Sequence, residues 1–258
     1  MRRGLTSAIL AWSLADIGAA ADIPPDDRRS GTTVMGPALQ AMQNDDSGNP
    51  AGLWLADGQA LWDERNGDAD KSCADCHGAA ATAMKGVATR YPAVDPVSRQ
   101  PIDLEQRINL CRTTRQKAPA LAFESRELLS LTALVARQSR GLPIAVAVTP
   151  ESRPFIDAGN ALFHRRQGQL DLSCAQCHDD NWGRHLGGAV IPQGHPTGYP
   201  LYRLEWQTLG SLQRRLRNCM AGMRAEPYAY GSPDAVRLEL YLMWRAQGMT
   251  WEAPGLRP

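Results

Sequence analysis

The 258-residue sequence predicts a mainly α-helical protein built from two tandem domains that are related by internal duplication. Three observations support this prediction. A pattern of residues in the first half of the chain recurs in the second half. Apolar residues recur at helical spacing in both halves. Strand signals are scarce, because the best candidate, residues 144–148, lies between two prolines and is better interpreted as a linker.

The duplication is visible in two pairs of segments. Gly58–Trp62 (GQALW) matches Gly159–Phe163 (GNALF). Farther along, Leu104–Cys111 matches Leu212–Cys219, with several extra residues inserted in the second half. We therefore expect each half to fold around a site of its own.

A C-x-x-C-H motif follows the first matched segment in each half. The two copies are Cys73, Cys76 and His77, and Cys174, Cys177 and His178. In such a motif two thiols bond the vinyl groups of a haem and the histidine ligates its iron. A zinc ribbon or a thioredoxin site would leave both histidines unexplained. The sequence thus predicts two cytochrome c-type haem domains with two covalently attached c-type haems.

Helical periodicity predicts two further elements in each half. They span residues 53–62 and 127–140 in the first half, and 155–163 and 233–247 in the second. Ser125 and Ser232 are suited to cap the two later helices, and Gly141 and Gly248 to end them.

The N-terminus has the pattern of an export signal. Arg2 and Arg3 precede the mostly apolar run 5–14, and Ala19–Ala21 supplies a cleavage site. We expect a signal peptide (1–21), an N-terminal arm (22–49), a first domain (50–143), a linker (144–152) and a second domain (153–258). The expected location is the periplasm, because haem is attached to such motifs after export.

Charge and hydropathy exclude some classes of partner. The formal net charge is +1, which gives no reason to expect a nucleic acid or an anionic membrane as a partner. No apolar run after the signal approaches the roughly 18 residues that a membrane-spanning helix needs. We therefore expect neither nucleic acid nor membrane binding.

The ligand on the far side of each iron is less obvious. Two cysteines, Cys111 and Cys219, remain after haem attachment and occupy matching places in the repeat. Cysteine is the only ligating residue type found at matching places downstream of the motif in both halves. The methionines and histidines weighed against it are Met84, Met220 and Met223, and His164, His185 and His195. A disulfide between Cys111 and Cys219 remains an alternative.

Three segments of the second half resemble one known family. They are the run Arg215–Tyr228 around Cys219, the segment Glu239–Leu242 and the segment Glu252–Gly255. They resemble the SoxA family, whose members are dihaem subunits of the SoxAX cytochrome of bacterial thiosulfate oxidation. The likeness extends from about residue 50 to the end of the chain.

The resemblance implies the iron ligands. His77 and Cys111 would ligate the first iron, and His178 and Cys219 the second. It also implies that Cys219 carries an additional sulfur as a persulfide and is the catalytic residue of the second domain. Arg215, four residues before Cys219, would contact the substrate.

The resemblance further implies an activity and partners. The enzyme would be an L-cysteine S-thiosulfotransferase, which joins thiosulfate oxidatively to a cysteine of a SoxYZ carrier protein and passes two electrons to a soluble cytochrome c. A SoxX monohaem cytochrome would complete a heterodimer, with the acidic stretch 57–70 and the arm 22–49 as candidate docking surfaces. The alternative is a non-catalytic periplasmic dihaem electron-transfer cytochrome.

The local charge agrees with an anionic substrate. Residues 203–245 contain seven arginines and four acidic residues, in a chain that is otherwise nearly neutral. Arginine presents a planar fork of donors that matches oxyanions. Four further arginines could add to this basic pocket, although a solvated surface position is the ordinary expectation for each: Arg214, Arg217, Arg224 and Arg245.

Overall fold

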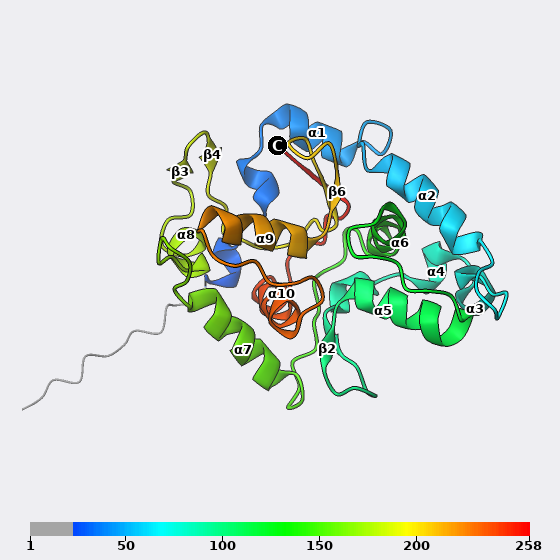
Figure 1. Cartoon of the computed structure of the whole chain (residues 1–258). Helices are drawn as coiled ribbons and strands as arrows, with labels where there is room; N and C mark the ends of the chain where they lie inside the picture. The colour runs from blue at the N-terminus through cyan, green and yellow to red at the C-terminus, as the bar shows by residue number, and fades with distance from the viewer. Residues whose placement is uncertain (1–22) are drawn as a thin grey trace, which may run out of the picture.

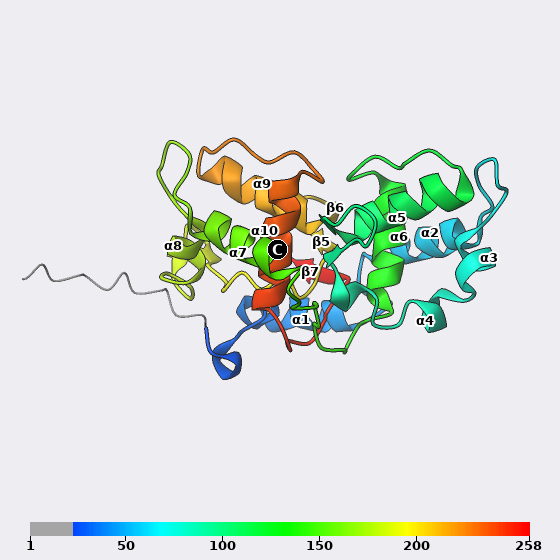
Figure 2. The same ribbon diagram turned by 90° about the horizontal axis from the view of Figure 1, so that it is seen from below.

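The structure is a computed structural model that describes residues 23–258, so the predicted signal peptide lies outside the described residues. Two helical halves stand side by side, with helices α2 to α6 in one and α7 to α10 in the other (Figures 1 and 2). The mainly α-helical, duplicated architecture predicted from the sequence is confirmed.

Four helices of the first half correspond to four of the second. In the first half these are α2 (Gly52–Asp63), α3 (Cys73–His77), α5 (Leu104–Cys111) and α6 (Arg126–Arg137). Their counterparts are α7 (Arg153–His164), α8 (Cys174–His178), α9 (Leu212–Gly222) and α10 (Pro233–Arg245). The remaining short helices are α1 (Pro37–Asn44) and α4 (Ala80–Ala83), with single turns η1 (Pro25–Asp27), η2 (Gly31–Val34), η3 (Ala88–Arg90) and η4 (Arg112–Gln116).

The ends of the helices follow local signals. The Ser125 side chain accepts a hydrogen bond from the Leu128 N–H and caps α6, and Ser232 caps α10 in the same way. The helix expected over residues 127–140 ends earlier, at Arg137, and a turn continues to Gly141. Gly141 has a positive φ of 83°, which accounts for glycine at this place.

The glycine of the repeated segment sits where two helices cross closely. In the first half α2 packs against α6, and in the second α7 packs against α10. A Cβ added to Gly58 would lie 2.3 Å from the Ser130 carbonyl oxygen, and one added to Gly159 would lie 2.1 Å from the Arg237 carbonyl oxygen. The repeat therefore conserves a backbone-to-backbone helix contact within this chain.

The sequence did not reveal the β-structure. Within residues 23–258, seven strands of two or three residues form three small sheets: β1 (Ala93–Val94) with β2 (Pro101–Ile102), β3 (His185–Leu186) with β4 (Ala189–Val190), and the sheet β6 (Thr208–Gly210), β5 (Leu201–Arg203), β7 (Gly255–Arg257). β5 pairs antiparallel with β6 and parallel with β7. Such short strands lack the alternation that identifies a strand from sequence.

The segment between α6 and α7 is extended but joins no strand. Its Ile144 and Val146 are buried, and Ile144 exchanges backbone hydrogen bonds with Gly248 and Met249 after α10. One apolar cluster contains residues of both halves, including Trp62 and Tyr241. The two halves therefore share a core.

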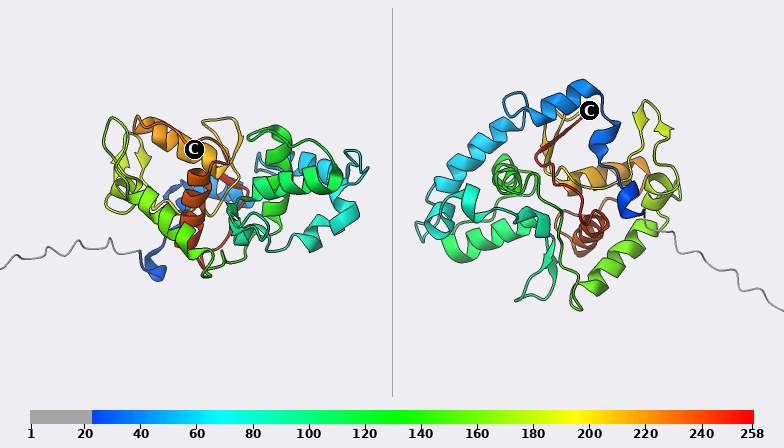
Figure 3. Two further views of the ribbon diagram at one scale, coloured as in Figure 1. Left: turned by 60° about the horizontal axis from the view of Figure 1, so that its bottom comes forward. Right: turned by 180° about the vertical axis from the view of Figure 1, so that it is seen from behind.

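The N-terminal segment runs across the second half before it enters α2 (Figure 3). The Arg29 N–H donates to the Gln193 side chain at 2.6 Å, and Arg28 donates to the Gln247 carbonyl at 2.8 Å. Among residues 23–258, no helix has the length and apolar character to cross a membrane.

The close crossing of α7 and α10 makes a stability prediction. Gly159→Ala should lower the free energy of unfolding by about 3 kcal/mol, because the added methyl meets backbone atoms that cannot move independently. Urea unfolding of the haem-loaded protein, followed by circular dichroism, would measure this. Gly36→Ala is the matched control, since nothing lies within 4 Å of its added Cβ. Equal midpoints for the two variants would contradict the helix contact.

Candidate functional site

The second C-x-x-C-H motif forms the short helix α8. Ser173 accepts a hydrogen bond from the Gln176 N–H, while the Gln176 side chain accepts from the Ser173 N–H. This reciprocal cap starts the helix at Cys174, so Cys174 and Cys177 lie one turn apart and share a face. The first motif is capped in the same manner by Ser72 and Asp75.

A single hydrogen bond fixes the orientation of the His178 ring. Its Nδ1 lies 2.7 Å from the Pro192 carbonyl oxygen. Because a carbonyl only accepts, the proton must be on Nδ1, which leaves the lone pair of Nε2 available to a metal. Gly194 allows this approach, since a Cβ there would lie 3.1 Å from the imidazole Cγ.

His178 lines the principal cavity of the second half, which has a volume of about 340 Å³. Its walls are mainly apolar. The apolar side chains that line it include Phe163, Leu212, Leu216, Met220, Met223, Leu238 and Leu242. Cys174, from the attachment motif, also reaches this cavity.

Cys219 enters the same cavity from α9. Burial raises the pKa of its thiol, but hydrogen bonding with His178 and the positive charges of Arg215 and Arg203 outweigh this effect. The pKa of Cys219 therefore lies below its ordinary value, which favours the thiolate.

Arg215, which the family resemblance implies as a contact with the substrate, also lines the cavity. It stands one helical turn before Cys219, so the two side chains share a face of α9. Within residues 23–258, its guanidinium has no hydrogen bond and no ion pair. A half-buried arginine without a partner has its donors free for an anion.

The sequence analysis missed three polar residues of this wall. Arg203 on β5 and Arg257 on β7 are paired across the parallel strands, and both line the cavity with Tyr199. Arg203 also donates to the Pro258 carbonyl at 2.9 Å, and Arg257 donates to the Gln43 side chain at 2.6 Å. Arg203 and Arg257 come together only because β5 pairs with β7. No local sequence pattern predicts this pairing.

The four other arginines that could have added to the basic pocket do not line the cavity. Arg245 is buried and paired with Asp179, and Arg217 donates to the Tyr228 carbonyl. Arg214 lies 3.7 Å from the Glu124 carboxylate and stacks over Trp206. Arg224 is exposed just beyond α9. Helical spacing could not distinguish these structural roles from a contact with the substrate.

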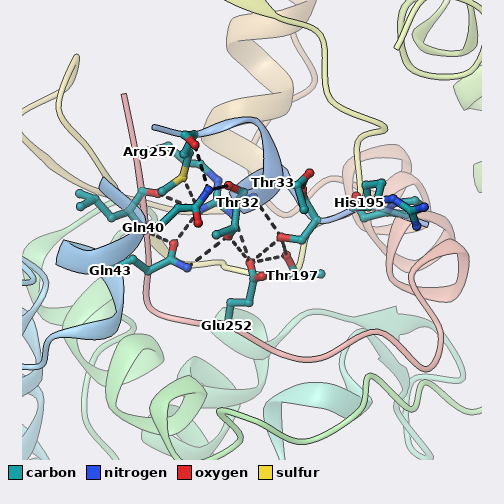
Figure 4. Close-up of polar contacts among 12 residues, drawn as sticks. Thr32, Thr33, Gln40, Gln43, His195, Thr197, Glu252 and Arg257 are labelled. Carbon is teal, nitrogen blue, oxygen red and sulfur yellow. Dashed lines mark hydrogen bonds and ion pairs between the residues drawn. The ribbon is translucent and has the colours of Figure 1, made fainter. Parts of the chain in front are cut away.

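The N-terminal arm covers one side of the cavity, which Gly31, Val34 and Met35 help to line. Glu252 holds the arm in place (Figure 4). Its carboxylate accepts hydrogen bonds from Ser30 at 2.7 Å, Thr32 at 2.9 Å and Thr197 at 2.8 Å, and from Arg257 at 3.2 Å.

The first half brings its predicted residues together as well. Cys111 is the last residue of α5. It lies close enough to both Cys73 and Cys76 for their charges to interact. The His77 ring lies beside Trp62, with ring centroids 5.8 Å apart. Burial raises the pKa of Cys111, and the charges of the nearby arginines do not reverse this.

The two sites therefore differ in charge although they share a framework. The pKa of Cys111 is raised and that of Cys219 is lowered. The cysteines in residues 23–258 are all free, so the alternative of a Cys111–Cys219 disulfide is wrong. Each of these two cysteines instead lies beside the attachment motif of its own half.

The histidines weighed as ligands have other surroundings. His195 is buried at the edge of the cavity, with Nδ1 3.1 Å from the Arg29 carbonyl oxygen. Burial lowers its pKa to about 4. His164 lies 3.8 Å from Asp179, and His185 is exposed on β3.

The second site fits a covalently attached haem. It combines attachment thiols, an imidazole whose Nε2 is free to ligate, and a thiol that favours its ionised form. Cys174, His178 and Cys219 share a cavity whose walls are mainly apolar, as a porphyrin requires. Cys219 and His178 face each other across this cavity, so both could ligate one metal.

Known proteins share this arrangement. The family model described as "SoxA/TsdA, cytochrome c domain" matches residues 57–144 and 158–251. The L-cysteine S-thiosulfotransferase subunit SoxA of Rhodovulum sulfidophilum is 36% identical over 90% of this chain and 81% of its own length. The corresponding subunit of Pseudaminobacter salicylatoxidans is 33% identical over 91% of this chain and 82% of its own.

A solved structure agrees with the sequence relatives. The crystal structure of SoxXA from P. pantotrophus superposes with a TM-score of 0.86 at 30% identity, and the match covers 90% of this chain and 87% of the other. Both repeats of the family model fall on the two halves that pack around the cysteine motifs. The chain is a c-type cytochrome with covalently attached haem, and it belongs to the SoxA family.

Proposed function

We propose that this chain is the catalytic subunit of an L-cysteine S-thiosulfotransferase. It couples thiosulfate oxidatively to a cysteine of a SoxYZ-like carrier and forms a cysteine S-thiosulfonate. The relatives named for this activity support the proposal. The observation that carries it is the unpartnered Arg215 beside Cys219 in the second cavity.

The residues of the second cavity have distinct parts in this reaction. Arg215 binds the sulfonate oxygens of thiosulfate, which is a dianion. Arg203 adds positive charge on the same side. Cys219, as a thiolate or a persulfide, presents a nucleophilic sulfur to the incoming group. A protein that only carried electrons would not need an unpaired arginine at this place.

Haem, when bound, supplies an iron that accepts the electrons released as the sulfur–sulfur bond forms. We propose two covalently attached haems. Cys73, Cys76, His77 and Cys111 would hold the first. Cys174, Cys177, His178 and Cys219 would hold the second.

The proposed partners follow from the same relatives. A solved relative is a SoxXA complex, which supports a SoxX-like monohaem subunit in a heterodimer with this chain. A soluble cytochrome c would accept the electrons. Export to the periplasm is supported by the N-terminal pattern of basic and apolar residues and by the attachment motifs.

Mass spectrometry of the periplasmic protein under non-reducing conditions tests the cofactor content. We expect the mass of the chain after signal removal plus two haems, and one additional sulfur atom on the Cys219 peptide. A double variant, Cys73→Ala with Cys76→Ala, should keep a single haem and serves as the control. One haem in the unaltered protein, or a Cys111–Cys219 cross-link, would contradict the assignment.

Replacing the reactive cysteine separates catalysis from haem attachment. Cys219→Met should retain both haems, because the attachment thiols are unchanged, but should lose thiosulfate-dependent turnover with the carrier. Haem content is read from the intact mass and turnover from the S-thiosulfonate formed on the carrier. If the variant still turns over, Cys219 is not the catalytic residue.

Arg215→Gln should weaken thiosulfate binding without removing haem. Loss of one charge-assisted interaction costs about 2 kcal/mol, so kcat/KM for thiosulfate should fall by about 30-fold. Steady-state kinetics against thiosulfate concentration would measure the change. Arg153→Gln is the control, because Arg153 is exposed and pairs only with the neighbouring Asp157. Equal kinetics for both variants would remove Arg215 from the site.

A further inference from the structure

Three carboxylic side chains meet where the two halves join. Asp103 caps the start of α5, Glu105 lies in its first turn, and Glu239 lies on α10. Asp103 is fully buried and Glu105 is 8% exposed. Among the described residues, these three acids form no ion pair. A buried carboxylate without a cation is unfavourable, so this cluster tends to hold protons.

Gln213 on α9 links two of the three acids. Its side-chain amide donates to Asp103 at 2.7 Å and to Glu239 at 3.2 Å. Its oxygen accepts from the Gly231 N–H at 2.8 Å, which fixes the amide in this orientation. Glu105 is different, because its carboxylate finds only the N–H of its own backbone. It is a buried polar side chain without an external partner.

Glu105 and Glu239 both line a second, smaller cavity. Its volume is about 30 Å³, which is sufficient for a water molecule. The other polar side chains on its wall are Tyr91, Thr132 and Tyr199. Water in this space would reach both carboxyl groups.

Tyr199 stands between the two cavities. Together with Pro196 and Leu212, it lines both the small cavity and the large cavity that contains Cys219. It is the only one of these three with a polar side chain. Its hydroxyl interacts with the charges of Arg215, Arg257 and Cys219 at the large cavity, and water in the small cavity would complete a route from it to the acids.

The pKa values of the three acids are raised toward the range in which they can accept a proton from a thiol. Burial raises the pKa of Asp103 to about 6 and that of Glu239 to about 8. Burial and the neighbouring acids raise the pKa of Glu105 well above its ordinary value. An ordinary cysteine thiol has a pKa of about 8.5, so its proton is well matched to such an acceptor.

The other ionisable groups around the cluster are already engaged. Glu124 accepts from the Ser211 N–H at 3.3 Å and lies 3.7 Å from Arg214. Tyr91 accepts a hydrogen bond from Arg107 at 3.2 Å, and Arg107 pairs with Asp95. No arginine neutralises the three acids themselves within residues 23–258.

The proposed reaction releases one proton, which requires an acceptor. The S–H bond of the carrier cysteine breaks, and a bond forms between that sulfur and the terminal sulfur of thiosulfate. The two sulfurs together lose two electrons, which leave to a c-type cytochrome acceptor. One proton remains for each S-thiosulfonate formed.

We propose that Tyr199, water in the small cavity and the carboxyl cluster of Asp103, Glu105 and Glu239 form an internal proton acceptor for this reaction, a role that rests on the proposed function. The cluster takes up the proton as electrons reach the iron, so that the buried charge stays balanced. The acids act through Tyr199 and do not touch the substrate.

Potentiometry of the holoprotein without substrate tests the coupling. In the unaltered protein the reduction potential of the second haem should fall as pH rises from about 6 to about 8, because protonated acids favour the reduced iron. Full coupling changes the equilibrium constant tenfold per pH unit, or about 59 mV for one electron. Glu239→Gln should remove the part of this dependence near pH 8, since glutamine cannot titrate, while Asp103 still gives a dependence near pH 6.

Two other variants sharpen the test. Glu127→Gln, at an exposed position on α6, should leave the pH dependence unchanged. Tyr199→Phe should keep the pH dependence, because the acids remain, but should slow single-turnover coupling of thiosulfate by about 100-fold. A flat curve in the unaltered protein, or an unchanged curve in Glu239→Gln, overturns the acceptor. An unchanged rate in Tyr199→Phe overturns the route.

The potentiometric arm contains no thiosulfate or carrier. Failure of the thiosulfotransferase activity in the unaltered protein would therefore count against the proposed function and not against the titration of the cluster. Loss of the pH dependence with intact activity would count against the proton acceptor alone.

Discussion

The contact between His178 and Cys219 is the interaction on which the second half depends. One residue comes from the attachment helix α8 and the other from α9, and the two must meet inside an apolar cavity. A hydrogen bond to the Pro192 carbonyl holds the imidazole, and the α9 turn carries Arg215 to the same place. The sheet, the N-terminal arm and the α7–α10 pair are arranged around this meeting point. The charged residues on these elements set the pKa of the Cys219 thiol and therefore its reactivity.

Internal duplication has produced two sites that share a framework but differ in chemistry. Each half pairs its attachment helix with a cysteine at the same place of a capped helix. Around Cys111, burial prevails and raises the pKa of the thiol. Around Cys219, His178 and the two nearby arginines prevail. Small changes in the surroundings of a conserved scaffold thus separate a reactive sulfur from a less reactive one.

Local signals made much of this structure predictable. Ser125 and Ser232 cap their helices, and the apolar spacing of residues 53–62 and 155–163 identified α2 and α7, because caps and periodicity act over a few residues. The strands β5 and β7 and the role of Arg203 could not be predicted, since they depend on pairing between distant segments. The role of Arg245 was equally hidden. It lies in an arginine-rich stretch, and the sequence does not indicate that it is buried and paired with Asp179.

The anchoring of the arm by Glu252 affects how the protein matures. Ser30 and Glu252 are separated by 222 positions, so their hydrogen bond requires nearly the whole chain to be present. Contacts between such distant segments form slowly, because a large loop must close first. One wall of the second cavity is therefore complete only when the C-terminal segment around Glu252 has reached Ser30, and until then the cavity that contains Cys174 and Cys219 lacks this cover.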